Sequence, residues 1–167
     1  MGKLDNQAVL QKITARFGER ISIPQEPFGL LTFETAKENI TEILTFLKED
    51  AELRFNYLTD ITAVHYPEKE LPIGVVYHVH SMVNNVRVRI KVFLEAENPV
   101  VPSATPLWNG ANWMERETYD FFGINFEGHP NLVRILNVDE MTAFPMRKEY
   151  PLEDPNRVDK RDFFFGR

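Results

Sequence analysis

The sequence contains no cysteine among its 167 residues. This absence excludes disulfides, thiol nucleophiles, zinc ribbons and iron–sulfur clusters held by cysteine. No apolar run approaches the roughly 18–20 residues that span a bilayer, and the N-terminal stretch lacks the apolar segment of a signal peptide. Walker loops, Gly-x-Gly-x-x-Gly and Gly-x-Ser-x-Gly are also missing, so nucleotide binding and serine hydrolysis have no support in the sequence.

The composition is that of one folded domain with an acidic balance. Hydrophobic residues make up 43% of the chain and charged residues 26%, which is enough apolar material for one sizeable core. The formal net charge is −6 at pH 7. A negative balance disfavours a broad nucleic-acid surface, and we therefore expect no nucleic-acid partner.

Two amphipathic helices are predicted in the first fifty residues. Asp5 or Asn6 can cap the first one, and Gly18 is its expected end. Short strands are expected at 21–23 and 29–33. The stretch from Thr35 to Glu38 has the form of a capping box that opens the second helix. The apolar stripe of that helix, at period 3.6, consists of Ile40, Ile43, Leu44 and Leu47.

Three longer strands are predicted to follow, over 55–64, 75–83 and 86–94. The last one alternates cleanly between apolar and basic residues, as a half-buried antiparallel strand does. Asn84-Asn85 is expected to form a two-residue turn before it. We favour an ordinary solvated face for the basic side of this strand over a surface for nucleic acid, anionic headgroups or an acidic protein. That side consists of Arg87, Arg89 and Lys91.

This order of elements predicts an α+β fold of two layers, with helices on one face of a mostly antiparallel sheet. We place the domain at residues 1–138. Within it, Thr105-Pro106 is a candidate helix start, and Gly123 is the expected end of that helix. A turn at 125–130 and an extended piece at 132–136 complete the domain.

The remaining segment, residues 139–167, has a different character. It holds seven acidic and six basic residues and shows no apolar period, so it cannot form a core of its own. We predict an extended arm that lies on the surface of a partner. Its aromatic anchors would be Phe144, Tyr150, Phe163, Phe164 and Phe165.

Charged residues are dense in the third predicted helix. Glu115 and Glu117 are two positions apart and point to different sides of a helix, so they do not form a catalytic dyad. Arg116 and Asp120 have the i, i+4 spacing of an ion pair. We favour a helix face satisfied by ion pairs over acid/base catalysis.

The four histidines offer two further candidates. His78 and His80 lie on one face of a strand and could begin a metal site, but two ligands from one strand are a weak signal. We favour a solvent-facing or interface role for this pair. His129, directly before a proline, could serve as a general base, and we favour a structural role in a turn.

Three motifs in the second half of the chain resemble the signature of a known family. They read ERETYDFFGI at 115–124, HPNLVRIL at 129–136 and PMRKEYPL at 145–152. This pattern closely resembles the C subunit of respiratory complex I, the thirty-kilodalton subunit family of NADH–quinone oxidoreductase. Stretches 58–61 and 75–78 extend the resemblance over most of the chain. Met146, where the family usually has Leu, and 139–145, which lacks the family's common Trp and Gly, depart from it.

The resemblance implies a two-layer α+β domain whose mostly antiparallel sheet is mixed, in agreement with the order of elements. It also implies a non-catalytic subunit in the peripheral arm of a proton-pumping complex. The chain itself would bind no flavin, iron–sulfur cluster, metal or quinone and would have no activity alone. It would hold in register the subunit that shapes the quinone cavity and the small cluster-bearing subunits. It would touch the membrane only through the complex, on the cytoplasmic side of the inner membrane if the source is bacterial.

The resemblance also gives the charged residues of the motifs a structural meaning. Arg116 would form a buried or interfacial ion network with Glu115, Glu117 and Asp120. Arg134, Arg147 and Lys148 would pair with acidic groups on a partner. The residues assigned to partner interfaces or to the structural motif are Trp113, Glu115, Arg116, Glu117, Asp120, His129, Arg134, Arg147, Lys148, Tyr150, Phe163, Phe164 and Phe165.

Two other functions stay open on the sequence. One is the equivalent subunit of a membrane-bound hydrogenase or another complex-I-like oxidoreductase, in which the same fold serves. The other is a free-standing hydrolase that uses Asp120 and His129.

Overall fold

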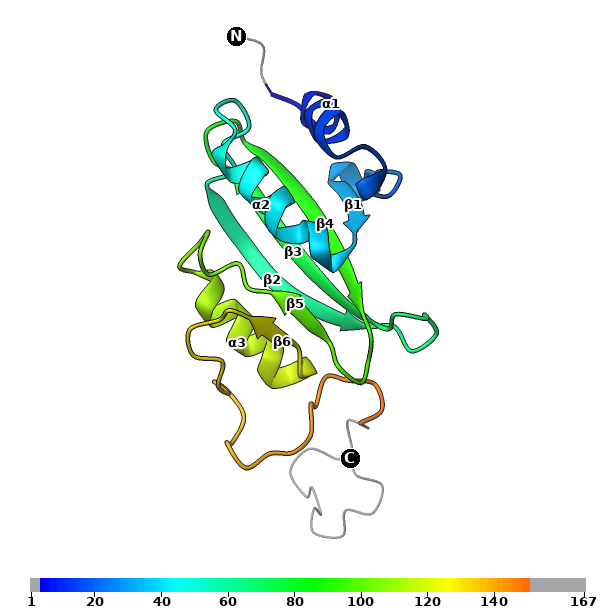
Figure 1. Cartoon of the computed structure of the whole chain (residues 1–167), viewed down its shortest axis with the longest axis vertical. Coiled ribbons are helices and arrows are strands. Elements are labelled where there is room, and N and C mark those ends of the chain that lie inside the picture. The colour runs from blue at the N-terminus through cyan, green and yellow to red at the C-terminus, as the bar shows by residue number, and fades with distance from the viewer. Residues whose placement is uncertain (1–3, 151–167) are drawn as a thin grey trace, which may run out of the picture.

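A four-stranded sheet forms the centre of the molecule, and α2 lies across one of its faces (Figure 1). The computed structural model describes residues 4–150. Three short 3-10 turns at 18–20, 27–29 and 37–39 accompany the regular elements. Those elements are α1 (Asn6–Phe17), β1 (Leu31–Thr35), α2 (Ile40–Glu49), β2 (Tyr57–His65), β3 (Ile73–Ser81), β4 (Val86–Leu94), β5 (Val100–Pro102), α3 (Ala111–Phe122) and β6 (Asn125–Glu127).

The sheet has the order β1-β4-β3-β2 and is mixed, as expected. β1 pairs with β4 in parallel, whereas β4, β3 and β2 are antiparallel neighbours. The predicted alternation along β4 is confirmed, because Val86, Val88, Ile90, Val92 and Leu94 are all buried. The α+β fold class is therefore confirmed.

The first helix is confirmed at both ends. The Asp5 carboxylate accepts a hydrogen bond from the backbone N–H of Ala8 at 2.8 Å, and Gly18 ends the helix with φ +53°. Val9, Ile13 and Phe17 face the core, and the Phe17 ring meets Phe46 of α2 edge-on with centroids 5.5 Å apart.

Three local predictions in the first half are wrong. The capping box does not form, because Thr35 belongs to the β1–β4 ladder and its hydroxyl donates to Arg20 O at 2.8 Å. The strand at 21–23 reduces to isolated bridges on either side of Pro24. The turn between β3 and β4 spans four residues, 82–85, with Asn85 at φ +54°. The stripe predicted for α2 is nevertheless fully buried.

α3 starts five residues later than predicted and ends where predicted. Residues 104–110 form turns, because the Ser103 hydroxyl and the Ala104 N–H bind the Glu115 carboxylate and hold this segment against the side of the helix. At the other end Gly123 adopts φ +73° and donates its N–H to Tyr119 O at 2.7 Å.

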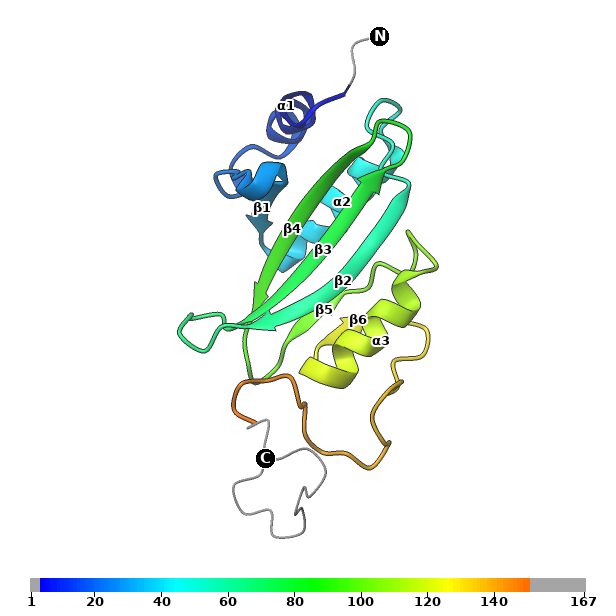
Figure 2. The same ribbon diagram turned by 180° about the vertical axis from the view of Figure 1, so that it is seen from behind.

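α3 lies along the open edge of β2 (Figure 2). The Thr118 hydroxyl donates to Ile61 O of that strand at 3.1 Å, so the helix satisfies part of an otherwise unpaired strand edge. Beyond α3, β6 pairs in parallel with β5, a two-stranded sheet that the sequence did not predict. Both strands have only three residues, too few for a visible alternation.

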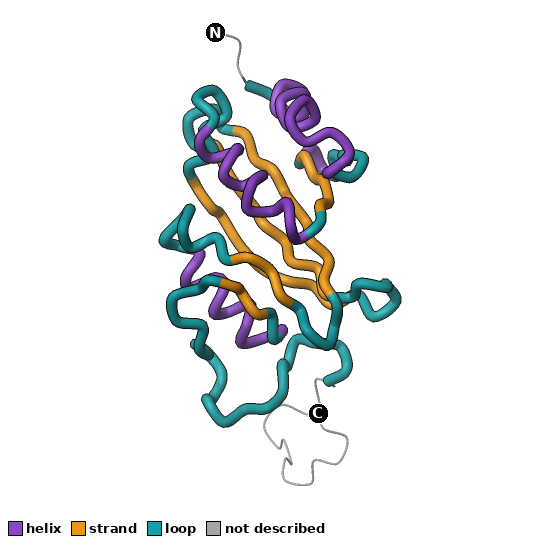
Figure 3. The backbone as a smooth tube through the Cα atoms, viewed as in Figure 1, coloured by secondary structure: helices purple, strands orange, loops and turns teal. Residues whose placement is uncertain are grey.

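Residues 128–150 contain no helix or strand and run as a long loop past α3 (Figure 3). The division between a domain at 1–138 and an arm at 139–167 stays a prediction. The described part of the arm contacts the domain, since Met146 N–H donates to Phe121 O and Lys148 N–H donates to His65 Nδ1. Within residues 4–150, no helix has both the length and the apolar character needed to cross a membrane.

Candidate functional site

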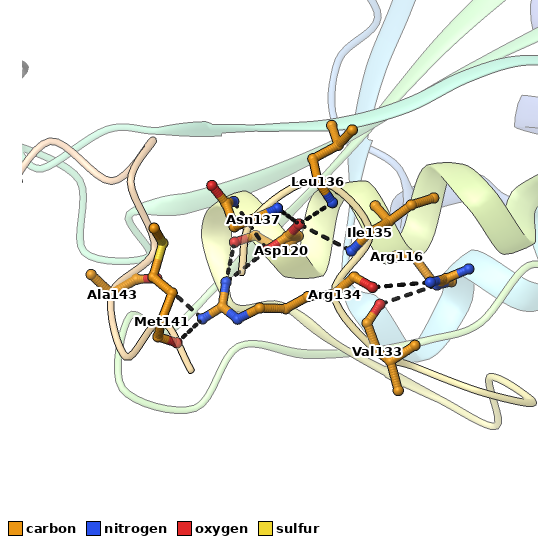
Figure 4. Close-up of polar contacts among 9 residues, drawn as sticks. All are labelled: Arg116, Asp120, Val133, Arg134, Ile135, Leu136, Asn137, Met141 and Ala143. Carbon is orange, nitrogen blue, oxygen red and sulfur yellow. Dashed lines mark hydrogen bonds and ion pairs between the residues drawn. The ribbon is translucent and has the colours of Figure 1, made fainter. Parts of the chain in front are cut away.

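The carboxylate of Asp120 is the centre of the charged motif (Figure 4). Asp120 lies in the last turn of α3 and is fully buried. Its Oδ2 accepts the three consecutive backbone N–H groups of Ile135, Leu136 and Asn137 at 3.1, 2.8 and 2.9 Å. Its Oδ1 accepts from the Asn137 amide at 3.0 Å. Successive N–H groups that converge in this way form an anion-binding nest, and here a side chain of the same protein fills it.

Arg134 supplies the positive charge beside this carboxylate. Its Nη1 donates to Asp120 Oδ1 at 2.7 Å and to the Asp120 carbonyl at 2.9 Å. Its Nη2 donates to Met141 O at 2.6 Å and Ala143 O at 3.2 Å. The side chain is only 8% exposed. The prediction that Arg134 pairs with an acid on a partner is therefore wrong, because the acid is in the same chain.

These donors decide the protonation of Asp120. Burial alone would raise its pKa, but the backbone N–H groups of Asn137 and Leu136, the Arg134 guanidinium and the Asn137 amide outweigh burial. Together they hold the pKa of Asp120 well below its usual range. The carboxylate stays ionised at neutral pH and is a poor general base.

Arg116 does not pair with Asp120, although the spacing allowed it. Its Nε donates to Val133 O at 3.1 Å and its Nη2 to Arg134 O at 2.9 Å (Figure 4). The neighbouring Trp113 is 60% exposed, and its ring centroid lies 5.6 Å from the guanidinium carbon of Arg116. The expected ion network around Arg116 is wrong, because loop carbonyls take the place of acids.

Glu115 is fully buried on another side of α3. Its Oε2 accepts from the Ser103 hydroxyl at 2.7 Å and its Oε1 from the Ala104 N–H at 2.6 Å. Burial raises the pKa of Glu115 to about 7, against the opposing effect of these two donors. The buried Tyr77 hydroxyl has no hydrogen-bond partner among residues 4–150, and burial together with the charge of Glu115 raises its pKa. Glu117, two residues further on, is exposed.

His129 has the structural role that we favoured. Its Nε2 lies 3.1 Å from Asn112 O, and its Nδ1 accepts the Asn131 N–H at 3.0 Å. These contacts place the ring proton on Nε2 and tie the start of the loop to the first turn of α3. With both ring nitrogens engaged and Asp120 saturated with donors, the geometry does not favour the hydrolase hypothesis.

The arm begins with a latch formed by Arg147. Its Nε donates to Phe122 O at 2.6 Å and its Nη1 to Ala96 O at 3.1 Å, while Glu149 lies 3.7 Å away. This side chain therefore satisfies carbonyls of its own domain, including one at the end of α3, and the expected pairing with a partner is wrong. The Lys148 side chain is exposed, as is Tyr150. The predicted anchors Phe163, Phe164 and Phe165 lie outside the described residues.

Phe144 packs on its own domain as well. Its ring covers Gly123, and the guanidinium carbons of Arg134 and Arg147 each lie 5.2 Å from the ring centroid. Tyr119 approaches the ring edge-on at 6.2 Å between centroids. The anchor predicted for a partner thus closes the loop over the end of α3.

The strand histidines do not form a metal site in the described part of the chain. His78 Nε2 accepts from Arg89 Nε at 2.9 Å, and burial and Arg89 lower its pKa. His80 is buried, and its Nε2 has no hydrogen-bond partner in the part of the chain that the structure describes. Across residues 4–150, no group of three potential metal ligands comes together.

Three residues of the site were not predicted from the sequence. Asn137 directly follows the HPNLVRIL motif, so its position was the available signal. Ser103 lies outside the three motifs, twelve residues before the Glu115 that it binds. Nothing in the sequence pointed to His65, because its contact with Lys148 joins residues 83 positions apart.

The fold and this site define an α+β domain with a charged centre that shapes its own chain: the Asp120–Arg134 pair binds the backbone of residues 135–137, 141 and 143 and so holds the loop against α3. The chain belongs to the family of the respiratory-chain NADH dehydrogenase 30 Kd subunit, whose model matches residues 33–156. This family is the one that the three motifs indicated.

Curated relatives agree along nearly the whole chain. The C subunit of the NADH-quinone oxidoreductase of Citrifermentans bemidjiense is 45% identical over 153 residues, which cover 92% of this chain and 94% of the relative. The corresponding C subunit of Roseiflexus sp. (strain RS-1) is 44% identical over 149 residues, covering 89% of this chain and 86% of the relative.

Solved structures share the fold. A trypsin-resistant fragment of Nqo5 superposes with a TM-score of 0.66 at 31% identity, covering 75% of this chain and 98% of the fragment. A chain of a membrane-bound sulfane sulfur reductase, an archaeal respiratory membrane complex, gives a TM-score of 0.73 at 24% identity, covering 87% of this chain and 85% of that chain. The second likeness shows the fold alone.

Proposed function

We propose that this chain is a non-catalytic structural subunit of an NADH–quinone oxidoreductase, complex I. The observation that carries the proposal is the membership of the 30 Kd subunit family, with relatives named as the C subunit of this enzyme along nearly the full chain. The geometry agrees with a structural role, because the buried Asp120 carboxylate and the Arg134 guanidinium hold the loop after α3.

The chemistry of such a complex would take place on other subunits. We expect the flavin, the iron–sulfur clusters and the quinone to be held by those subunits. The lack of cysteine supports this for the clusters, and the hydrogen bonds that the Asp120 carboxylate accepts from backbone N–H groups of its own chain agree with a structural role. We expect the isolated chain to bind no cofactor and to show no turnover.

Its contribution would be geometric. We expect it to contact the subunit that shapes the quinone cavity and the small cluster-bearing subunits, and to keep them at fixed separations in the peripheral arm. In a bacterium this position would be on the cytoplasmic side of the inner membrane, with membrane contact only through the complex.

A pull-down tests the proposal. The tagged chain is captured from detergent-solubilised membranes of its source, and the eluate is identified by mass spectrometry and assayed for NADH–quinone reductase activity. We expect a large assembly with flavoprotein, cluster proteins and activity, while the purified chain alone is inactive. Capture of the chain alone, or turnover by the purified chain, would refute the proposal.

The same experiment separates the alternative. An assembly that carries a hydrogenase or another oxidoreductase and lacks NADH oxidation would replace complex I by a related complex. The likeness to the sulfane sulfur reductase chain does not favour this outcome, because 24% identity shows the fold alone.

A further inference from the structure

Between 133 and 138 the loop has backbone groups turned toward the domain and exposed aliphatic side chains, whereas the preceding Leu132 packs against the core. The N–H groups of Ile135 and Leu136 point to Asp120, and the carbonyls of Val133 and Arg134 point to Arg116 (Figure 4). Such bonds to a buried charge are strong, so they dictate which side of the loop faces the domain.

The outward side chains form what we call the aliphatic ledge, which consists of Val133, Ile135, Leu136 and Val138. They are 43%, 38%, 64% and 63% exposed. Single exposed aliphatic residues are ordinary, but four within six residues concentrate exposed apolar area on one loop, as interaction sites do. The loop cannot rotate to bury them, because the charges that hold its backbone would lose their partners.

The charged residues beside the ledge indicate the charge of the partner that can bind there. Asp139 and Glu140 follow it directly and are exposed, and so is Glu117 on the helix beneath. The guanidinium groups of Arg116 and Arg134 are engaged with the loop itself. A second copy of the chain would bring like charges together, and an anionic membrane surface would be repelled.

We propose that the aliphatic ledge is a docking surface for another subunit of the same complex, one that presents an apolar groove bordered by Lys or Arg. This inference rests on the proposed function and adds the surface through which the chain joins its complex. The motif residues thus affect assembly indirectly. Asp120, Arg134 and Arg116 fix the conformation of the loop, and the exposed side chains of the ledge make the contact with the partner.

The test replaces two ledge residues in the full chain. Leu136→Asp with Val138→Asp puts two carboxylates on the ledge without touching the polar centre. Because both side chains are more than 60% exposed, we expect the purified variant to melt within a few degrees of the wild type. In the pull-down from membranes we expect a roughly tenfold or greater loss of co-purified subunits, as for residues at the core of an interface.

A matched variant controls for added charge. Ile23→Asp with Met82→Asp changes two residues that are 89% and 59% exposed and lie before β1 and after β3. We expect it to assemble like the wild type. Asp139→Lys with Glu140→Lys should also weaken assembly, because it reverses the charge beside the ledge.

The outcomes are distinct. Full assembly of the Leu136/Val138 variant would overturn the inference and leave the proposed function intact. Equal loss in the Ile23/Met82 control would also overturn it. A wild-type chain that self-associates in isolation, with the ledge variant monomeric, would assign the surface to a second copy instead. If the wild type captures no complex at all, the proposed function itself fails.

Discussion

The guanidinium of Arg134 and the carboxylate of Asp120 lie 2.7 Å apart, Nη1 to Oδ1, and join a helix end to a loop 14 residues further along the chain. The same Nη1 also donates to the Asp120 carbonyl, so one nitrogen satisfies both the side chain and the backbone of its partner. Both side chains are buried: that of Asp120 is 0% exposed and that of Arg134 is 8% exposed. The pair therefore determines the course of residues 133–143, which the helix alone could not direct.

Asp120→Asn is expected to remove an acid-sensitive part of the stability. The folded-state pKa of Asp120 lies below its ordinary value of 3.8, so its contribution is complete above that pH and is lost as the pH falls further. At pH 7 the variant should lose about 3 kcal/mol, because Arg134 keeps its charge without a counter-ion. Urea unfolding between pH 2 and 7 measures both effects.

The matched control for this prediction is Glu117→Asn, an exposed acid on the same helix. It should leave both the free energy of unfolding and its acid dependence close to wild type. If the Asp120 variant follows the wild-type pH profile at a constant offset, the ionised carboxylate is not the source of the acid sensitivity.

Glu115→Gln is expected to stabilise the protein at alkaline pH. The folded-state pKa of about 7 exceeds the ordinary value of 4.5, so the folded protein holds a proton that the unfolded chain has released. The stability from this group is complete below pH 4.5 and is lost as the pH rises through about 7. At pH 8 the variant should exceed the wild type by roughly 1–3 kcal/mol, measured by urea unfolding.

The neutral side-chain amide of Gln at position 115 fits the site. Its N–H can donate to the Ser103 hydroxyl oxygen, and the Ser103 hydroxyl can then donate its hydrogen to Thr105 Oγ1, which lies 2.7 Å away. The advantage should shrink toward pH 5. Glu117→Gln, two residues along, should show no such pH-dependent gain. An equal advantage of Glu115→Gln at both pH values would mean that Glu115 stays ionised in the folded state.

Gly123→Ala is expected to destabilise the end of α3 for two reasons. The residue has φ +73°, where a side chain is strained, and a Cβ there would lie 2.5 Å from Cε2 of Phe144. We expect a loss of about 2–4 kcal/mol in the free energy of unfolding, from the sum of backbone strain and the displaced ring.

Two other glycines separate these causes. Gly128 has φ +84° and no atom within 4 Å of the point that a Cβ would occupy, so Gly128→Ala should cost only the backbone strain, about 1 kcal/mol. Gly110 has φ −63° and equal space, so Gly110→Ala should be neutral or slightly stabilising. Equal losses at Gly123 and Gly128 would exclude the contact with Phe144 as a cause.

Arg147→Ala is expected to release the start of the arm. Its guanidinium holds Phe122 O and Ala96 O, and no other side chain in the described part of the chain donates to these carbonyls. Amide hydrogen exchange over residues 141–150 should become at least about tenfold faster, while the core strands stay protected.

Lys148→Ala is the control, because Lys148 contacts His65 through its backbone N–H, which the substitution keeps. Its exchange pattern should match the wild type. If Arg147→Ala also leaves the exchange over residues 141–150 unchanged, the Arg147 latch has no part in holding the arm.

The elements that the sequence determined are those governed by local rules. Asp5 and Gly18 delimit α1 because a cap and a left-handed glycine act on neighbouring backbone groups. The stripe of α2 and the alternation of β4 follow from the period of each element against one core. The three motifs identified the family from the order of residue types alone.

Only the tertiary structure decided which charged side chains pair with each other and which bind backbone groups. On the helix, Arg116 and Asp120 were suitably spaced, yet Asp120 takes Arg134 and the N–H groups of 135–137, and Arg116 takes two carbonyls of the same loop. Likewise Arg147 and Phe144, predicted to meet a partner, close onto their own domain. Local spacing limits what a side chain can reach, but a loop that folds back brings in backbone donors and acceptors that helical spacing does not show. A buried charge is stable only where enough hydrogen-bond partners and opposite charges surround it. The path of the chain therefore determined which of the ion pairs and hydrogen bonds allowed by the sequence are formed.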